Sequence, residues 1–536
     1  MFDMKKNIYD IISIQEIIYL LSFLILFGAR AVGLYEGKLL YNIALVLGIL
    51  TWGIKILVTE HSVLEYVIIC LLTLLALVIY KNTGEKGILL YFTMMLGMKN
   101  VSVRNVFKVG CGILSISYLL LVFSSILGIN NEIMYIQHRN GWGDVFRHSL
   151  GYPHPNTLHN TYVILVVLIM YLVGKQNWKK LMMISVVMFI GSYYIYLYSG
   201  SRTGLLTTGL YLFVNFWLQN RKKIFFIEKI FIYALYPSCL IFSIIGPLLV
   251  KGRLFDLIDK ILNTRWRLST YYLQNEPISL FGVRFKEPPT IHVMIDSSFL
   301  YSFLQLGLVA FVIITFLFVC IIHKCIKLDA RTELAIIISF CIMGISDPFM
   351  FNLSHKNFIF LFIGKMIYDY TTSIEVKKLP IMGRKIQMFK CGNKMISYPK
   401  ITIKSKVWKK KDCLIGSFVF AFAIIASVCI YVINTEPPMA MYVNKVIWDD
   451  NIRRGFLQKL EGQGEEDFFT KEEVKELKDK GIIIIQYENE ETPMCKVIGD
   501  APQMEYKRNI VSVGFWSGIL ALVMWIIVKK GFVEQS

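Results

Sequence analysis

Long apolar runs are the feature that most constrains how this chain can fold. Of its 536 residues, 55% are hydrophobic and only 18% are Asp, Glu, Lys or Arg, against about 25% charged residues in soluble proteins. A helix needs about 20 apolar residues to cross a bilayer, where every backbone amide and carbonyl must be hydrogen-bonded within the segment. Runs of this length recur along the chain. They exclude a soluble enzyme, a disordered scaffold and a fibrous protein, and they predict an all-α polytopic membrane protein.

About twelve membrane spans are expected in the first 370 residues, and two more follow residue 411. The fourth run, 87–98, is short enough to be partly re-entrant in the membrane. The expected spans are roughly 11–29, 39–58, 62–80, 87–98, 109–129, 158–174, 181–198, 204–219, 229–250, 298–322, 332–350, 354–370, 413–433 and 510–528.

The distribution of Lys and Arg predicts the orientation of these spans, because cytoplasmic loops carry an excess of both. The segment 371–411 holds eleven Lys and one Arg against one Glu, within a formal net charge of +19 for the whole chain. This segment and both termini are therefore expected in the cytoplasm, with 130–157 and 251–297 as long outer loops. The basic segment also suits attraction to anionic membrane lipid. It lacks the interleaved basic and aromatic residues of nucleic-acid-binding proteins, so no nucleic-acid partner is expected.

Three parts are expected along the chain, namely a polytopic core at 1–370, a basic cytoplasmic linker at 371–411 and a two-span module at 412–536. The module has a polar stretch, 434–509, between its two spans, and the orientation places this stretch outside. Within it, Thr470 and Glu473 form a capping-box pattern that predicts a short helix. The run Ile482–Tyr487 is typical of a strand. We therefore expect a small α+β outer domain on a C-terminal helical hairpin.

The outer loop 130–157 is the first candidate site. It holds three His and two Arg within nineteen residues, which are His138, Arg139, Arg147, His148 and His154, and Asn156 ends this stretch. Arginine presents a planar donor fork that suits phosphate, and histidine exchanges a proton near neutral pH. Arg139, Arg147, His154 and Asn156 are therefore expected to bind substrate. A solvated loop with a proline-rich turn is the alternative.

Arg202 is the second candidate, in the short connection Tyr198–Gly204 between two spans. The connection is so short that Arg202 is expected at or below the membrane interface. A charge placed toward the bilayer centre costs roughly 2.5–3.5 kcal/mol, which implies an ionic partner or a water-filled cavity. The alternative is an arginine whose side chain extends back to the interface.

The outer loop 251–297 supplies Arg265, Arg267 and His292 as further candidate ligands of the substrate. In an extended segment, Arg265 and Arg267 would point to the same side, whereas a helix would separate them. Both arrangements are compatible with the sequence.

Asp296 lies just before the span 298–322, at the outer edge of the membrane. Apolar surroundings there would raise its pKa and make it a useful general base. The alternative is helix capping, since Asp296 followed by two serines is ordinary N-cap chemistry. Asp347, in the turn between the eleventh and twelfth spans, is expected to cap that turn.

Cationic donors and a carboxylate at the membrane surface suit a substrate with a lipid-linked phosphate or pyrophosphate. A site on the outer face has no access to ATP or nucleotide sugars. A transfer reaction there would draw on a lipid-linked donor that is already in the outer leaflet.

Several of these segments together resemble the polysaccharide polymerases of the O-antigen and capsule (Wzy) type and the related O-antigen ligases. The matching segments run in the family's order, as Gly97–Ser102, His148–Asn156, Ser199–Gly204, Arg265–Arg267 ahead of Phe281-Gly282, and Asp296–Tyr301 with Gly307. The resemblance implies a GT-C-like bundle of about twelve transmembrane helices in residues 1–370. It implies a membrane glycosyltransferase that uses neither a metal nor a nucleotide cofactor.

In this family the donor is a growing glycan on undecaprenyl pyrophosphate, and the acceptor is a lipid-linked repeat unit at the outer face of the bacterial cytoplasmic membrane. The product is a capsule, exopolysaccharide or O-antigen. The resemblance assigns the pyrophosphate to Arg202 and to Arg265 or Arg267. It leaves the base open among Asp296, His292 and His154. It also suggests a chain-length regulator and a flippase as partners.

The chain departs from the family in two respects. Where the ligases carry a histidine, this chain has Asp296, as some polymerases do, so a ligase is the weaker alternative. The module 412–536 is an addition whose layout is similar to that of the chain-length regulators. A flippase or transporter is the second alternative. Transporters gather charged residues at the membrane midplane, whereas here polar residues gather in two outer loops.

Overall fold

The computed structural model describes residues 9–34, 37–130, 134–139, 143–286, 295–351, 356–375, 382–389, 395–399, 410–438, 440–444, 482–487 and 494–534. Its contacts divide the chain into two compact units. The core unit comprises 1–130, 151–193 and 201–400, and the hairpin unit comprises 131–150, 194–200 and 401–536. The division does not follow chain order, because two short inner segments belong with the C-terminal part.

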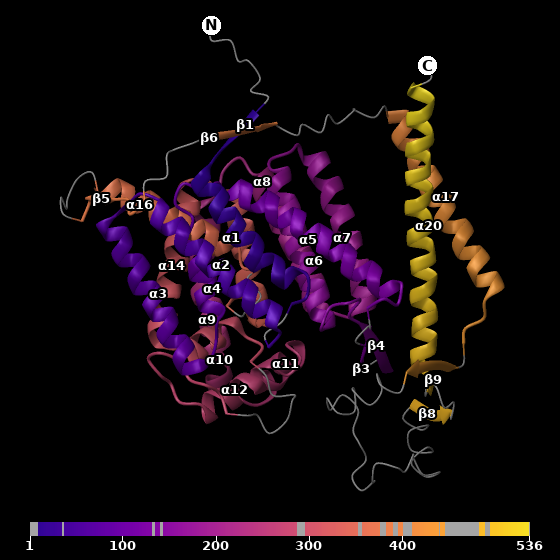
Figure 1. Ribbon diagram of the computed structural model, residues 1–536. Helices are drawn as coiled ribbons and strands as arrows, with labels where there is room; N and C mark the ends of the chain where they lie inside the picture. Colours follow the sequence, from indigo (N-terminus) through magenta and orange to yellow (C-terminus); the bar gives the residue numbers. More distant parts are fainter. Residues whose placement is uncertain are drawn as a thin grey trace. The chain divides into compact units, whose positions relative to one another are not determined.

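The core unit is a helical bundle (Figure 1). Its first helices are α1 (Ile14–Ala31), α2 (Leu39–Val58), α3 (Val63–Thr83), α4 (Gly87–Leu96), α5 (Val103–Ile126), α6 (Pro155–Val173), most of α7 (Trp178–Ser199) and α8 (Arg202–Asn220). Next come α9 (Phe226–Leu240), the π-helical η1 (Ile241–Ile245), α10 (Gly246–Leu249), α11 (Arg253–Ile261) and α12 (Arg265–Asn275). The last are α13 (Ser298–Leu300), the π-helical η2 (Tyr301–Gln305), α14 (Leu308–Lys327), α15 (Arg331–Met343), the 3₁₀ turn η3 (Pro348–Met350) and α16 (Ile359–Glu375).

Helices occur along the expected spans that the structure describes, but those at 87–98, 204–219, 332–350 and 354–370 are not among the candidate membrane spans. Ten helices in the described part of the chain are long and apolar enough to cross a membrane, and two of these follow residue 410. The chain is therefore a mostly helical, multi-pass membrane protein. The short fourth run forms α4, which has 10 residues. It rises only about 15 Å, half of a typical hydrocarbon core.

Buried aromatic side chains fill the centre of the core unit. The rings of Phe107 and Phe358 lie 5.2 Å apart, and those of Phe27 and Phe358 lie 5.6 Å apart. On α16, Gly364 allows a close approach, because an added Cβ would lie 2.1 Å from the carbonyl oxygen of Met95 on α4. The apolar start of α16 is thus enclosed by protein on all sides, as expected of a helix that is hydrophobic around its whole circumference.

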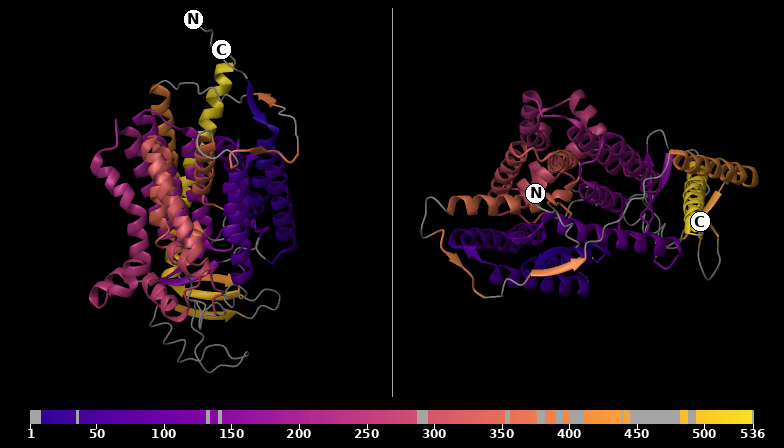
Figure 2. Two further views of the ribbon diagram at one scale, coloured as in Figure 1. Left: turned by 90° about the vertical axis from the view of Figure 1, so that its left-hand side faces the viewer. Right: turned by 90° about the horizontal axis from the view of Figure 1, so that it is seen from above.

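Two small sheets close one end of the bundle. Strand β1 (Tyr9–Ser13) pairs antiparallel with β6 (Met395–Pro399), and β2 (His61–Ser62) pairs antiparallel with β5 (Lys385–Ile386). The segment before α1 and the basic segment after α16 therefore meet at one end, which we call the sheet end. The helices α11 and α12 lie at the opposite end, which we call the loop end (Figures 1 and 2). Charge bias predicts that the sheet end is cytoplasmic.

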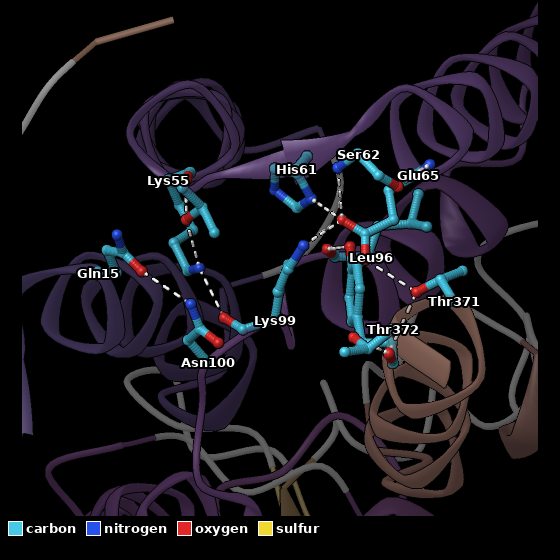
Figure 3. Close-up of polar contacts among 12 residues, drawn as sticks. Gln15, Lys55, His61, Ser62, Glu65, Leu96, Lys99, Asn100, Thr371 and Thr372 are labelled. Atoms are coloured by element: carbon cyan, nitrogen blue, oxygen red, sulfur yellow. Dashed lines mark hydrogen bonds and ion pairs between the residues drawn. The ribbon is translucent and has the colours of Figure 1, made fainter. Parts of the chain in front are cut away.

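A network of charged residues is buried at the sheet end (Figure 3). The carboxylate of Glu65, at 1% exposure, accepts hydrogen bonds from His61 Nδ1 at 3.1 Å and from Thr371 Oγ1 at 2.8 Å, and it also binds Lys99 Nζ. Lys55 Nζ donates to the carbonyl oxygen of Lys99 at 2.8 Å. One carboxylate thus connects the starts of α3 and β2, the segment after α4, and the end of α16.

The hairpin unit is built on two antiparallel apolar helices. Its elements are β3 (Met134–Arg139), β4 (Gly143–His148), the last residues of α7, α17 (Lys410–Asn434), β7 (Ala440–Asn444), β8 (Ile482–Tyr487), β9 (Met494–Gly499) and α20 (Asp500–Glu534). Helices α17 and α20 run side by side (Figures 1 and 2). An added Cβ at Gly518 would lie 2.7 Å from Ile424, and Ser427 hydrogen-bonds Ser517 at 2.5 Å. Small residues are typical of such close contacts between membrane helices.

The polar stretch between α17 and α20 contributes a three-stranded sheet in the order β7-β9-β8. Strand β8 has the bounds that the sequence predicts, while the helix predicted from Thr470 lies outside the described residues. One boundary differs from the prediction. Helix α20 begins at Asp500, ten residues before the apolar run, so the last part of the expected outer domain is helical. Pro502 in the first turn suits a helix start, where its missing N–H costs no bond.

Replacing Glu65 tests how far the buried network stabilises the bundle. We expect Glu65→Ala to lower the free energy of unfolding by about 3–5 kcal/mol, because removing one partner leaves buried cations unpaired. Denaturant titration of the detergent-solubilised protein measures this change. Glu60→Ala, at a nearby exposed position, is the control and should change stability little. Equal stabilities for the two variants would contradict the structural role of Glu65.

Candidate functional site

Arg265 and Asp296 form an ion pair at the loop end of the core unit. Arg265 Nε lies 3.5 Å from Asp296 Oδ2, and the Asp296 side chain keeps 33% of its surface exposed. The same Nε donates to the carbonyl oxygen of Ser346 at 2.7 Å, and Nη1 donates to that of Leu262 at 2.9 Å. Burial raises the pKa of Asp296, and the positive charge of Arg265 opposes the rise. The carboxylate is therefore oriented by a cation yet still open to a ligand.

Helix α12 separates the two arginines that the sequence leaves either together or apart. Residues two apart on a helix point to different sides, and α12 begins at Arg265. Arg267 Nε lies 3.6 Å from Asp259 Oδ2, and its side chain is 68% exposed. Only Arg265 therefore belongs to the ion pair with Asp296. Trp266, between them, is buried against Phe242 and has the position of a core residue.

The structure does not support the capping alternative for Asp296. The N-cap of α13 is Ser297, and no side chain caps this helix. Ser298, the first residue of α13, instead donates its hydroxyl to the carbonyl oxygen of Asp347 at 2.6 Å. The carboxylate of Asp296 is thus free for its contact with Arg265.

Asp347 is a second carboxylate at the same place. It caps the turn η3 by accepting from the amide of Phe349 at 3.0 Å, as expected, and it also accepts from Asn160 Nδ2 at 2.8 Å. Burial raises the pKa of Asp347 to about 6, and the negative charge of Asp296 adds to the rise. The contact with Asn160, a helix residue of α6, was not foreseen. Its only signal in the sequence was a polar residue inside an apolar run.

Lys356 is a buried cation close to these carboxylates. It is 7% exposed, and its Nζ donates to Thr161 Oγ1 at 2.7 Å. Asp347 is the opposite charge that interacts with it. Asn160 and Thr161 are adjacent on α6. This helix therefore hydrogen-bonds both Asp347 and Lys356, which lie in the segment between α15 and α16.

Arg202 lies at the loop end as well. Arg202 begins helix α8. At the opposite end of α8, Arg331, the first residue of α15, donates to the carbonyl oxygens of Leu218 at 3.2 Å and Lys222 at 2.9 Å. Helices α8 and α15 pack together and therefore run antiparallel. The start of α8 then lies where α15 ends and leads into Asp347. Arg202 is exposed, and no described residue forms a hydrogen bond or ion pair with its guanidinium.

Gly204 fixes the start of α8 against α6. An added Cβ would lie 2.4 Å from the ring of His159, which is buried and hydrogen-bonded to Ser192 at 2.9 Å. His159 precedes Asn160, the partner of Asp347. The Ser-Arg-Thr-Gly sequence at 201–204 is thus packed next to the residues that hold the carboxylate.

Gly282 of the large loop lies against Gly307, the N-cap of α14, although 25 positions separate them. Gly282 and Gly307 have φ of +79° and +85°, and an added Cβ at Gly307 would lie 2.1 Å from the amide nitrogen of Gly282. Only glycine adopts these angles without strain. The amide of Leu308 also donates to the carbonyl oxygen of Ser279 at 2.9 Å. The loop that carries Arg265 is thereby attached to the start of α14, behind Asp296.

The remaining predicted residues have different positions. His154 is the N-cap of α6, where its Nδ1 accepts from the amide of Asn156 at 3.1 Å. His292 lies outside the described residues, and so does the side chain of Arg139. Arg147 belongs to the hairpin unit, where it is buried and its Nε donates to the carbonyl oxygen of Ser199 at 2.7 Å.

The arrangement at the loop end can perform proton transfer and bind an anion. A half-buried carboxylate that is oriented by an arginine suits general base catalysis. Arg202, for which the described residues provide no ionic partner, begins a helix, and this position suits a phosphate group because the helix dipole also attracts anions. The fold defines a multi-pass membrane protein, and Arg265, Asp296, Asp347 and Arg202 are ionisable residues at one end of its bundle. Comparison with protein-family models, curated proteins and solved structures finds no match.

The raised pKa of Asp347 predicts a pH dependence of stability. The native carboxyl, with a pKa of about 6, holds its proton more tightly than an unfolded one near 3.8. Native stability from this group is therefore present below pH 4 and is lost as the pH rises to about 6, by about 1–2 kcal/mol after solvent screening. Asparagine does not titrate. We therefore expect the thermal stability of Asp347→Asn, relative to that of the wild type, to rise as the pH is raised from about 4 to about 6. A difference between Asp347→Asn and the wild type that does not change with pH would contradict it.

Proposed function

We propose that the chain is a polysaccharide polymerase, a membrane glycosyltransferase that acts on lipid-linked glycans at the outer face of a bacterial cytoplasmic membrane. The donor is a growing glycan on undecaprenyl pyrophosphate, and the acceptor is one lipid-linked repeat unit. The observation that carries the proposal is the half-exposed Asp296 carboxylate, which pairs with Arg265 instead of capping a helix. The order of the family-like segments along the chain also supports it.

The reaction forms one C–O bond and breaks another. A hydroxyl of the acceptor sugar attacks the anomeric carbon of the donor glycan, and the bond from that carbon to the pyrophosphate oxygen breaks with its electron pair. Asp296 takes the hydroxyl proton as general base. Arg265 keeps this carboxylate ionised and aimed, since it also binds the carbonyl oxygen of Ser346.

The leaving pyrophosphate needs positive charge that is not already committed to the protein. Arg202 meets this need, because the described residues leave its guanidinium free and it begins helix α8. Asp347 acts as a positioning residue. It holds the turn after Ser346 through Asn160 and through its own cap. No metal or nucleotide enters this scheme, and a chain-length regulator and a flippase are the protein partners that such a reaction would use.

Replacing Arg202 is the sharpest test of the anion-binding role. Since Arg202 has no partner in the described structure, Arg202→Ala should leave folding intact yet lower polymerisation by about 10²–10³-fold, as loss of a charged transition-state donor does. The assay scores glycan ladders from purified protein and lipid-linked repeat units. Lys260→Ala, at an exposed position of the same end, should retain activity. Long polymer from Arg202→Ala would refute the role.

Asp296→Asn tests the base. Asparagine keeps the size of the side chain and an oxygen for Arg265, but it cannot take the proton. We expect a loss of about 10²–10⁴-fold in rate with an unchanged amount of folded protein. A normal ladder from this variant would remove Asp296 from the reaction and leave His292 or His154 as the base.

A further inference from the structure

The first turns of α20 carry polar residues that the proposed reaction does not use. Arg508 is 5% exposed, and its guanidinium spans two segments that are far apart in sequence. Its Nε donates to the carbonyl oxygen of Leu197 at 2.7 Å, and its Nη2 donates to that of Phe146 at 2.9 Å. The guanidinium also lies over the ring of Tyr198, 5.4 Å from its centroid. One side chain thus holds strand β4 and the end of α7.

Glu505 extends this clamp to the candidate loop. Its carboxylate accepts from Arg508 Nη1 and lies 3.1 Å from His148 Nε2. Arg147, the neighbour of His148, is bound in the same unit through its contact with Ser199. His148 is therefore held by α20 directly. Arg147 is held by the end of α7, which α20 binds through Arg508.

Each of the two segments gains hydrogen bonds from outside itself. A two-stranded hairpin such as β3–β4 is marginally stable alone in water. The last carbonyls of a helix lack intrahelical partners, and in α7 those of Leu197 and Ser199 accept from Arg508 and Arg147. Positive charge is favourable at a helix C-terminus because of the helix dipole. The two arginines therefore bind carbonyls at the end of α7, and Arg508 also binds one in β4.

The contact continues along α20 at helical spacing. The hydroxyl of Ser512 bonds that of Tyr198, and the ring of Phe515 stacks on Tyr194 at 4.3 Å. Trp516 Nε1 donates to the hydroxyl of Tyr194 at 2.8 Å. Positions 505, 508, 512 and 515 face one way on a helix. This face of α20 is therefore built to receive the end of α7.

We propose that Arg508, with Glu505, is a positioning residue of the proposed glycosyltransferase, and that the C-terminal module supports the outer loop 130–157, which the sequence predicts to bind substrate. Arg508 fixes the strand that carries Arg147 and His148, together with the helix end that leads through Ser199 into the connection before Arg202. The inference rests on the proposed function for its catalytic consequence, while the clamp itself stands on the contacts within the hairpin unit.

Hydrogen–deuterium exchange of the full-length protein in lipid nanodiscs tests the clamp without any substrate. Arg508→Met keeps the length of the side chain but removes every donor. We expect amides of 134–139, 143–148 and 194–200 to exchange about tenfold faster or more. Arg508→Lys can reach one carbonyl but cannot span both, and it should be intermediate. Lys507→Met, at the exposed neighbouring position, should match the wild type. Unchanged exchange in Arg508→Met would overturn the proposal.

Steady-state kinetics with lipid-linked repeat units test the positioning role. A misplaced binding loop weakens ground-state binding, so Arg508→Met should raise the apparent KM about tenfold with a smaller change in kcat. Loss of folded enzyme alone would lower kcat at constant KM and would refute positioning, as would faster exchange with unchanged kinetics. If the wild type makes no polymer, the proposed function fails, and the exchange experiment alone then decides whether Arg508 holds the loop.

Discussion

The cost of carrying charge into an apolar bundle governs how this protein is arranged. An ionised group that leaves water must be paired and hydrogen-bonded, or it destabilises the fold by several kcal/mol. At the sheet end, Glu65 meets this requirement with His61, Lys99 and Thr371, and four segments of the core unit converge on it. The carboxylate of Glu65 is buried and bound to these three side chains, which suits a structural role.

The loop end meets the same requirement less completely. Arg265 binds two backbone carbonyls and pairs with Asp296, but the carboxylate keeps a third of its surface exposed. Asp347 is held by Asn160 and by the turn that it caps. Arg202 has no partner among the described residues. The two ends thus differ in how far their charged side chains are paired within the protein. At the sheet end the Glu65 carboxylate is bound by protein groups, whereas at the loop end Asp296 and Arg202 remain accessible to a ligand.

The sequence predicts the coarse fold well because apolar runs of bilayer length leave few alternatives. Helices occur along the expected spans, of which ten rather than fourteen are candidate membrane spans in the described part of the chain, and β8 has its expected bounds. Hydrophobic periodicity predicts the local conformation less well where contacts with other parts of the chain determine it. The sequence left Arg265 and Arg267 either together or apart, and only the helix α12 settles it. The start of α20 was missed because its first turns are polar and carry no apolar signal.

The candidate site was predictable in part, for a related reason. Asp296 and Arg265 stand out as charged residues beside apolar runs, yet their pairing depends on a loop that folds back through Gly282 and Gly307. The contacts of Asn160 with Asp347 and of Lys356 with Thr161 were not predicted, since they join residues 187 and 195 positions apart. The grouping of Arg147 and His148 with Arg508 joins positions more than 350 residues apart. No local pattern contains that information.

The central claim is that this bundle transfers a glycan from a lipid pyrophosphate to a second lipid-linked glycan. Incubating the purified wild-type protein with lipid-linked repeat units, and following both products, tests it most directly. The account predicts a ladder of lengthened lipid-linked glycan together with one released undecaprenyl pyrophosphate for each bond formed. Repeat units that stay unextended, with no lipid pyrophosphate released from a folded protein, would contradict it.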